Sequence, residues 1–500
     1  MHAMNINYKK LLPVYIFLIS YIFMWLVYKD MWILVEARCW IESALQAKNS
    51  GVLIEMILAQ LRNLIIIGEN SRYASYAMVS IFSSICNYDV VCHNSFQILP
   101  LALTGALITT FLLQLGNSIL LATIFGSLWY ATEPVLSALG WQATVLDKFA
   151  AFYSVLGLNI ALYLYQKNNN KFNIFLSNIV LLILVIMANN SKEAAFSLMP
   201  SIIALYFLLD SYEAKKISFI SCSKLLLPTI YAIYQNYFFM AKQLSLPHAI
   251  EHNLSGNIWS NAGAFISYVF NHDNSGHIVL VSLISIIFVV LMIKVVLREY
   301  DKNFIFLIWA SISFFGTFTI IVQAKHTSVF YVLTSAAYLM ILLLIIYVNI
   351  FQIIAFIHRP LIKKIFFFMW NASLGALIFW QVYGFYQKYI TIYNPIIRAQ
   401  GLNISSSISQ IREIFKDEEY DGINIVYPAS NAIGYMYVKQ GCFYAFAVGQ
   451  EDKGQIKDMA IQFLDSENYS PDKNLPSNIY IIFDKKMNFI SAYKYNKKIK

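Results

Sequence analysis

Long apolar runs, separated by short loops that carry lysine and arginine, limit the fold of this chain more than any other feature. Of its 500 residues, 59% are hydrophobic and 13% are charged. A helix needs about 20 mainly apolar residues to cross the hydrocarbon core of a bilayer, whereas soluble domains carry roughly 25% charged residues. The composition therefore excludes an ordinary soluble protein and predicts an α-helical polytopic membrane protein.

Eleven runs are long enough for a membrane-spanning helix. We expect spans at residues 11–28, 98–115, 118–132, 145–165, 173–189, 194–210, 217–240, 278–297, 303–322, 327–349 and 365–385. The run 118–132 is the shortest, and Gly116-Asn117 predicts a turn before it. If 98–132 were a single span, every later loop would change sides; if it did not cross at all, the later orientation would stay the same.

The basic residues predict the orientation. Lys9 and Lys10 precede the first span, which places the N-terminus inside by the positive-inside rule. The other inside loops are then basic, with Lys167, Lys171, Lys215, Lys216, Lys224, Lys294, Arg298, Lys302, Arg359, Lys363 and Lys364. Because the basic residues follow this pattern, the net charge of +9 does not indicate nucleic-acid binding. A composition rich in Lys, Asn and Ile suggests a bacterial source, and thus a multi-pass protein of a bacterial inner (cytoplasmic) membrane.

Three regions are then outside: the first outer loop 29–97, residues 241–277, and a C-terminal domain, 386–500. Of 36 Lys and Arg residues, 14 fall within 386–500, as do 12 of 27 Asp and Glu residues. This charge density separates the domain from the transmembrane bundle of residues 1–385. The patterns predict a small α/β domain, with helices at 405–415 and 455–464 and strands at 423–427, 442–448 and 479–483.

Acidic and basic side chains near the outer ends of the spans are candidates for chemistry. Asp30 directly follows the first span, and a carboxylate there can act as a general base; Glu36, in the same loop, is its rival. The alternative for Asp30 is a solvated charge at a helix end. Basic side chains that can bind phosphate or anchor to lipid headgroups are Arg72, Lys192, Lys325 and His326.

The segment Asn190 to Pro200 is the most informative, because Lys192 and Glu193 lie together between two apolar runs. Charges at the edge of lipid often mark a polar cavity or substrate path, although a lysine in an interfacial turn can simply reach the headgroups. Asp147, at the start of the fourth span, and the nearby Trp141 are supporting candidates.

Metal binding has only weak support in the sequence. His248 and His252 fit an H-x-x-E-H pattern, but no third ligand stands out and short motifs of this kind often match by accident. We therefore predict no resident metal from these residues and leave a divalent cation open as a cofactor. Cys86 and Cys92 share the first outer loop, where a disulfide and two free thiols are equally compatible with the sequence.

Four segments together resemble the GT-C superfamily of integral-membrane glycosyltransferases, in particular its protein O-mannosyltransferase-like and bacterial cell-envelope branches. Asp30-Met31-Trp32 resembles the acidic motif that opens the first outer loop, although one acid stands where many members have two. Ser191-Lys192-Glu193 with Pro200 resembles a Lys-Glu…Pro motif. The other two segments are Ser71-Arg72-Tyr73 with Asn94, and Pro134 with Trp141 and Asp147.

The resemblance implies an inverting enzyme that transfers a hexose from a polyprenyl-phosphate donor at the outer face of the membrane. Its acceptor would be a cell-envelope glycan, a lipid or a protein. Asp30 would be the base, Arg72, Lys192 and Lys325 would bind the donor phosphate, and Glu193 would orient Lys192 or a sugar hydroxyl. Membrane lipids are the other expected partners, and no nucleic acid is expected.

Two other functions fit a polytopic chain. An O-antigen polymerase or ligase would need an Arg-rich outer loop, whereas residues 241–277 contain no arginine. A lipid or solute transporter often shows internal repeats and helices broken near the midplane. No repeat is visible, and the polar residues cluster at the outer ends of the spans, which favours an active site at the membrane interface.

Overall fold

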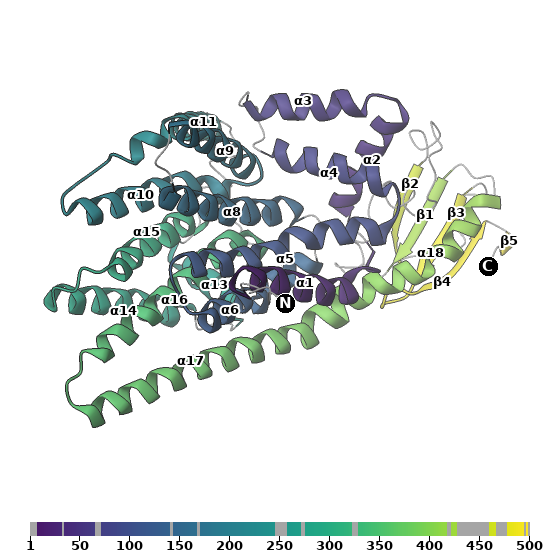
Figure 1. The fold of residues 1–500 in the computed structure, drawn as a ribbon. Helices are drawn as coiled ribbons and strands as arrows, with labels where there is room; N and C mark the ends of the chain where they lie inside the picture. The colour runs from purple at the N-terminus through teal and green to yellow at the C-terminus, as the bar shows by residue number, and fades with distance from the viewer. Residues whose placement is uncertain are drawn as a thin grey trace, which may run out of the picture.

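A computed structural model describes residues 8–32, 35–65, 72–140, 144–167, 171–245, 258–271, 276–322, 329–417, 422–427, 460–466, 478–494 and 497–498. These residues form a helical bundle with a small sheet near the C-terminus, at the opposite side from the α14 and α15 loops (Figure 1). The helices of the first half are α1 (Tyr8–Tyr28), α2 (Val35–Asn49), α3 (Leu53–Ile65), α4 (Tyr73–Cys86), α5 (Val90–Gln114), α6 (Ile119–Leu128), η1 (Trp129–Ala131), α7 (Glu133–Gly140), α8 (Val145–Lys167) and α9 (Lys171–Asn189).

The second half continues the bundle and ends in the sheet. Its helices are η3 (Glu193–Ser197), α10 (Leu198–Ala214), η4 (Cys222–Leu225), α11 (Leu226–Ser245), α13 (Ile258–Phe270), α14 (Gly276–Val296), α15 (Lys302–Val322), η5 (Val329–Val332), α16 (Leu333–Ala355), α17 (Pro360–Lys388), the π-helical η6 (Tyr389–Arg398) and α18 (Ala399–Asp417). A helix therefore covers most of each of the eleven predicted runs in the described residues, as the apolar patterns require.

Seven of the described helices are long and apolar enough to cross a membrane: α1, α5, α8, the η3–α10 segment, α14, α16 and α17 with its continuation. An eighth is added if α6–η1 and α7, which are bent by 50° at their junction, form one span. The apolar part of α9, Ile174–Asn189, is shorter than these. The protein is thus a multi-pass helical membrane protein, but the predicted count of eleven spans is not confirmed.

The boundaries of two predicted spans differ in the structure. Helix α5 begins at Val90, not near residue 98, because the Asp89 carboxylate accepts hydrogen bonds from the backbone N–H groups of Val91 and Cys92 at 2.9 and 3.2 Å. It ends at Gln114, and Gly116 adopts a φ of +90°, which confirms the predicted turn. Residues 217–221 are not helical, and α11 starts only after η4.

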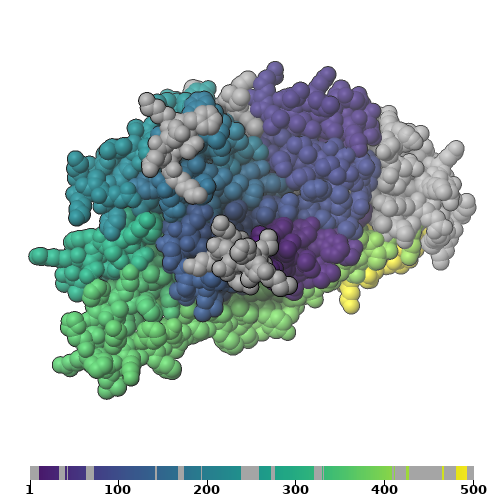
Figure 2. All heavy atoms as spheres, viewed as in Figure 1, coloured from purple at the N-terminus to yellow at the C-terminus, as the bar shows by residue number. Residues whose placement is uncertain are grey.

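Helices α5, α8 and α16 lie at the centre of the bundle. Most of α16 is buried, and the largest enclosed side chains of the core include Trp129, Trp309 and Tyr338. Helix α17, by contrast, runs along one edge of the molecule (Figures 1 and 2), and its buried residues are Gln381 and Gly384. Its exposed aromatic face, which includes Phe366 and Phe368, suits contact with lipid acyl chains.

Helix α17 continues without a break through η6 into α18, so the expected division between residues 385 and 386 falls inside one continuous helix. The predicted helix 405–415 is the second half of α18. Its serines are inside the helix rather than at its start, and the Ser406 and Ser407 hydroxyls donate to the Asn403 carbonyl oxygen at 2.8 Å. The long helix joins the bundle directly to the sheet.

The sheet has the order β2-β1-β3-β4-β5, with β1 (Gly422–Tyr427), β2 (Ala460–Asp465), β3 (Asn478–Phe483), β4 (Phe489–Lys494) and β5 (Lys497–Lys498). Strand β1 is parallel to both β2 and β3, and the last two pairs are antiparallel. The predicted strands 423–427 and 479–483 are confirmed as β1 and β3, and 442–448 lies outside the described residues.

The predicted helix at 455–464 is wrong for its described part, because residues 460–465 form β2. Ala460 to Asp465 pair in register with Gly422 to Tyr427 of β1. In so short a segment, the apolar residues Ile461 and Phe463 are compatible with the repeat of a helix and with that of a strand. Pairing with β1 favours the strand.

Candidate functional site

The turn that carries Asp30 is held by a buried amide in α5. The Nδ2 of Asn94 donates to the carbonyl oxygens of Tyr28, Lys29 and Met31 at 3.2, 3.0 and 2.7 Å. These are the last carbonyls around the C-terminus of α1, which have no partner within the helix. Asn94 therefore fixes the point at which the chain leaves the first span.

Asp30 itself points outward from this turn. Its side chain is 57% exposed, and its recorded ion pair among the described residues is with Lys29, at 4.0 Å. The following Met31 and Trp32 are buried. The backbone N–H of Trp32 donates to the Gly401 carbonyl oxygen of α18 at 3.2 Å. The carboxylate is thus accessible on a turn whose flanks are packed, an arrangement that a general base at the membrane interface needs.

Arg72 and Lys192, two of the predicted phosphate ligands, lie on two backbone segments that meet at one junction. Arg72 directly precedes α4, and Lys192 lies in the turn between α9 and η3. The Ala74 N–H donates to the Asn190 carbonyl oxygen at 3.2 Å, which joins the start of α4 to the end of α9. We call this meeting point the α4–α9 junction.

The α4–α9 junction is polar and buried. Asn189, Asn190, Ser191 and Lys192 are all at most 8% exposed. The Asn190 amide is used locally, because its Nδ2 donates to the Ile186 carbonyl oxygen and to the Tyr231 hydroxyl of α11, each at 2.9 Å. The Lys192 segment is therefore no ordinary interfacial turn, since its side chains are enclosed rather than extended into headgroups.

Two buried polar groups at the α4–α9 junction lack hydrogen-bond partners. Both the Oδ1 and Nδ2 atoms of Asn189 are unpaired in the described structure, and so is the Ser75 hydroxyl of α4. Both side chains are fully buried. An unpaired buried polar group costs about 1–3 kcal/mol, so a water or ligand that offers both acceptors and donors would stabilise the junction.

Asp147 and Lys148 are buried in the first turn of α8, at 4% and 2% exposure. The Lys148 ammonium donates to the Gln97 Oε1 of α5 at 3.2 Å. Gln97 is one turn along α5 from Asn94, so the predicted supporting residue Asp147 lies near the helix that holds the Asp30 turn.

Several predicted residues are beyond what the structure describes. Glu36 belongs to α2 and Glu193 to η3, but only their backbone is described. The remaining candidates lie outside the described residues: Trp141, His248, His252, Lys325 and His326. In the described part of the chain, no three His, Cys, Asp or Glu side chains are grouped to hold a metal ion.

Glu133 is a buried carboxylate that the sequence reasoning passed over. It begins α7 at the 50° bend after η1. The Lys388 ammonium lies 3.5 Å from its Oε2, and the Tyr393 hydroxyl donates to its Oε1 at 3.4 Å. An acid within the apolar stretch 129–140 was the available signal, since such residues are rare in spans and tend to be functional.

A network of amides surrounds the same bend. Asn271 and Gln381 both donate to the Ala131 carbonyl oxygen, at 2.8 and 3.1 Å, and Gln381 also donates to the Val269 carbonyl oxygen at 2.6 Å. The two bonds to Ala131 satisfy a backbone carbonyl at the break, and the bond to Val269 satisfies one near the end of α13. They also tie α13 and α17 to the bend.

Cys86 and Cys92 form a disulfide in the structure, which decides between the two alternatives that the sequence left open. The bond links the end of α4 to the first turn of α5. It therefore connects α4, which Arg72 directly precedes, with the helix that carries Asn94.

Fold and site together define a multi-pass helical membrane protein with polar, partly buried centres at the ends of its helices. No protein-family model matches the chain, and a search of curated proteins gave no significant match.

Proposed function

We propose that this protein is a membrane glycosyltransferase of the GT-C type. It transfers a hexose from a polyprenyl-phosphate donor to a cell-envelope glycan, lipid or protein acceptor at the outer face of a bacterial inner membrane. The orientation is the one that the basic loops predict, with the C-terminal domain outside. The proposal includes the full set of eleven spans, with α9, α11 and α15 crossing as well.

The α4–α9 junction is the observation that supports this function best. It brings together two cations, Arg72 and Lys192, with two buried polar groups that lack partners, Asn189 and Ser75. A sugar phosphate offers acceptor oxygens to the cations and hydroxyls to the amide. Arginine binds phosphate through paired N–H donors, and lysine binds it as a point charge.

The proposed reaction uses Asp30 as the general base. The acceptor hydroxyl gives its proton to the Asp30 carboxylate as its oxygen attacks C1 of the sugar. The bond between C1 and the phosphate oxygen breaks, the configuration at C1 inverts, and polyprenyl phosphate leaves with the bonding electron pair. Arg72 and Lys192 stabilise the charge that develops on this leaving group.

Binding of polyprenyl phosphate tests the proposal without knowledge of the sugar, because this lipid is the leaving group of every such donor. The variants are Arg72→Gln and Lys192→Gln. Arg62→Gln is the matched control, since Arg62 lies exposed in the last turn of α3. A charge-assisted hydrogen bond contributes about 1.5–3 kcal/mol, so each site variant should bind at least about tenfold more weakly.

Arg72→Lys keeps the charge and should retain part of the affinity, which separates phosphate binding from folding. Unchanged affinity in both Gln variants would exclude the α4–α9 junction as the phosphate site. Loss of affinity in Arg62→Gln to the same degree would mean that any surface charge matters.

A polytopic transporter remains the second candidate, because the bend between η1 and α7 is a broken helix with a buried charge pair. Broken helices of this kind often bind substrates in transporters. Proteoliposomes that contain donor lipid distinguish the two. A transferase releases free polyprenyl phosphate when an acceptor is supplied, whereas a transporter moves the intact lipid and leaves the bond to the sugar unbroken.

A further inference from the structure

A second polar site lies at the far end of α8 from the Asp30 turn. A small cavity of about 10 Å³, open on one side, is lined by Leu164, Tyr165, Ser177, Asn178, Tyr206, Ser221, Lys224 and Leu225. Tyr165 lies 17 residues beyond Lys148 in α8, so a rise of 1.5 Å per residue separates the two ends by about 25 Å. The cavity is therefore distinct from the glycosyltransferase site proposed above.

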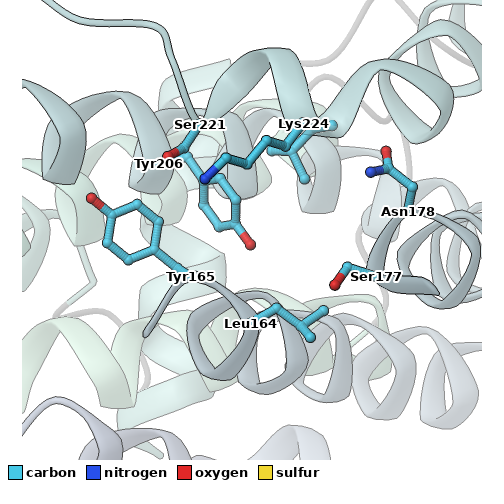
Figure 3. A pocket seen from close by; sticks show the side chains of 8 residues that line it. Leu164, Tyr165, Ser177, Asn178, Tyr206, Ser221 and Lys224 are labelled. Carbon is cyan, nitrogen blue, oxygen red and sulfur yellow. The ribbon is translucent and has the colours of Figure 1, made fainter. Parts of the chain in front are cut away.

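Four helical segments build this cavity. Tyr165 comes from α8, Ser177 and Asn178 from α9, Tyr206 from α10, and Ser221 and Lys224 from the region of η4. In Figure 3, the Lys224 side chain extends across the upper side of the cavity toward Tyr206 and Ser221, while Ser177 and Asn178 face it from α9. Six polar side chains and two leucines, Leu164 and Leu225, thus line a cavity at the end of apolar helices.

Two acidic groups of α10, Asp210 and Glu213, lie beside the cavity and interact with Tyr165. Asp210 of α10 is buried, and its carboxylate accepts hydrogen bonds from the Tyr165 hydroxyl, at 3.2 Å, and from the Ser221 N–H. The Tyr206 hydroxyl likewise donates to the Ala161 carbonyl oxygen at 2.8 Å. These bonds fix the positions of Tyr165, Tyr206 and Ser221 around the cavity.

Lys224 is different, because the described structure gives its ammonium neither an ion pair nor a hydrogen bond. The side chain is half-buried in the lining of the cavity. A cation in a partly buried polar cavity is a natural partner for an anion. The carboxylates of Asp210 and Glu213 beside the cavity oppose negative charge on the ligand, so a singly charged anion fits better than a dianion.

The loop beside the cavity is suited to the lipid headgroup region. Between α10 and η4 it exposes Ile217, Phe219 and Ile220 at 78%, 61% and 70%. The exposed lysines Lys215 and Lys216 precede these apolar side chains. Apolar side chains that enter the acyl boundary, next to lysines that attract anionic lipids, are typical of a membrane-surface anchor. The opening of the cavity is then at headgroup depth.

We propose that the mouth of this cavity binds the phosphodiester headgroup of an anionic glycerophospholipid, with Lys224 contacting the phosphate. Ser177, Asn178 and Ser221 form the buried polar wall behind Lys224. A phosphodiester carries a single negative charge, which the neighbouring carboxylates oppose less than two. The site draws its lipid from the leaflet at the α10–η4 end of the bundle and does not depend on the proposed glycosyl transfer.

Lipid retention by the purified full-length protein tests this inference. Native mass spectrometry counts the phosphatidylglycerol molecules bound during a titration in detergent, with phosphatidylcholine as the zwitterionic comparison. Wild-type protein should retain one phosphatidylglycerol in preference to phosphatidylcholine. Lys224→Gln should weaken this retention at least about tenfold, since one charge-assisted contact is lost, whereas Lys224→Arg should keep it.

Lys216→Gln is the matched control, because it removes an exposed lysine of the same loop that does not line the cavity, and it should change retention less than twofold. Equal retention of phosphatidylglycerol by wild type and Lys224→Gln would overturn the proposal, as would equal retention of the two lipids by wild type. Displacement of the lipid by millimolar inorganic phosphate would assign the cavity to a free anion instead. If Lys224→Gln does not fold, the preference of the wild type between the two lipids still decides.

Discussion

The Asn94 amide nitrogen donates to the Met31 carbonyl oxygen at 2.7 Å, and the same nitrogen reaches the carbonyls of Tyr28 and Lys29. One buried side chain of α5 thus holds the whole turn that carries Asp30. The position of the proposed base depends on a residue from another helix, which gives a direct test of the site.

Asn94→Leu keeps the side-chain volume but removes the donor, so three carbonyl oxygens around the end of α1 lose a shared partner. We expect a loss of about 1–3 kcal/mol in the free energy of unfolding and a lower thermal midpoint in detergent. Asn94→Asp places a carboxylate against these carbonyls and should be worse. An unchanged midpoint for both variants would show that the turn is held by other contacts.

Asp30→Asn should insert and fold normally, because the side chain is exposed. It should still bind polyprenyl phosphate but transfer sugar at least ~100-fold more slowly, the usual scale for loss of a general base. Glu36→Gln is assayed in parallel on purified protein. If Asp30→Asn turns over normally and Glu36→Gln does not, Glu36 is the base; if both are active, the first outer loop has no part in the proton transfer.

The pair Glu133–Lys388 should stabilise the junction between α7 and the long helix that leads to the sheet. Removal of one partner from a buried ion pair costs about 3–5 kcal/mol, because the other charge stays buried. Lys388→Met should therefore lower the thermal midpoint strongly, and Glu133→Gln in the same chain should recover part of the loss. A double variant that loses the sum of the two single effects would show that the groups are not coupled.

Stability of the β3–β4 turn should depend on pH through Asp484. Partial burial raises the pKa of this carboxyl, but hydrogen bonds from Asn488 and from the Lys486 N–H outweigh it and hold the pKa below its ordinary value. A lowered pKa in the folded state stabilises the fold above the ordinary carboxyl pKa of about 3.9. That stability is lost as the pH falls through this value toward the folded pKa.

Amide hydrogen exchange of residues 485–489, expressed as protection factors, measures this effect. Protection should fall between about pH 5 and pH 3 in wild-type protein. Asp484→Asn should be less protected at neutral pH and lose the pH dependence. Equal pH profiles for the two proteins would contradict the role of the carboxylate.

The proposed orientation predicts that a reporter fused after the C-terminus is active only outside the cytoplasm. The continuous helix from α17 to α18 makes this position preferable to one near residue 385, where an insertion would interrupt the helix. Cytoplasmic activity would place the C-terminal sheet on the inner side. It would also put Asp30 and the C-terminus on opposite sides of the membrane, or reverse the whole bundle.

The sequence by itself determined the class of protein and the approximate position of most helices of the bundle. Apolar runs of span length permit little other than helices in a membrane, because every backbone polar group must be satisfied within its own segment. Period-two patterns likewise sufficed for β1 and β3. These features depend on neighbouring residues, so a short stretch of sequence is enough to predict them.

Only the tertiary structure decided which polar residues meet. Arg72 and Lys192 share a junction because the start of α4 bonds to the end of α9, and Glu133 pairs with Lys388 because the chain breaks at η1 and α17 passes that bend. Residues 460–465 form a strand because β1 offers them a parallel partner. Contacts of this kind join segments far apart in the chain, and their geometry depends on how whole helices and strands pack, which no single window of sequence contains.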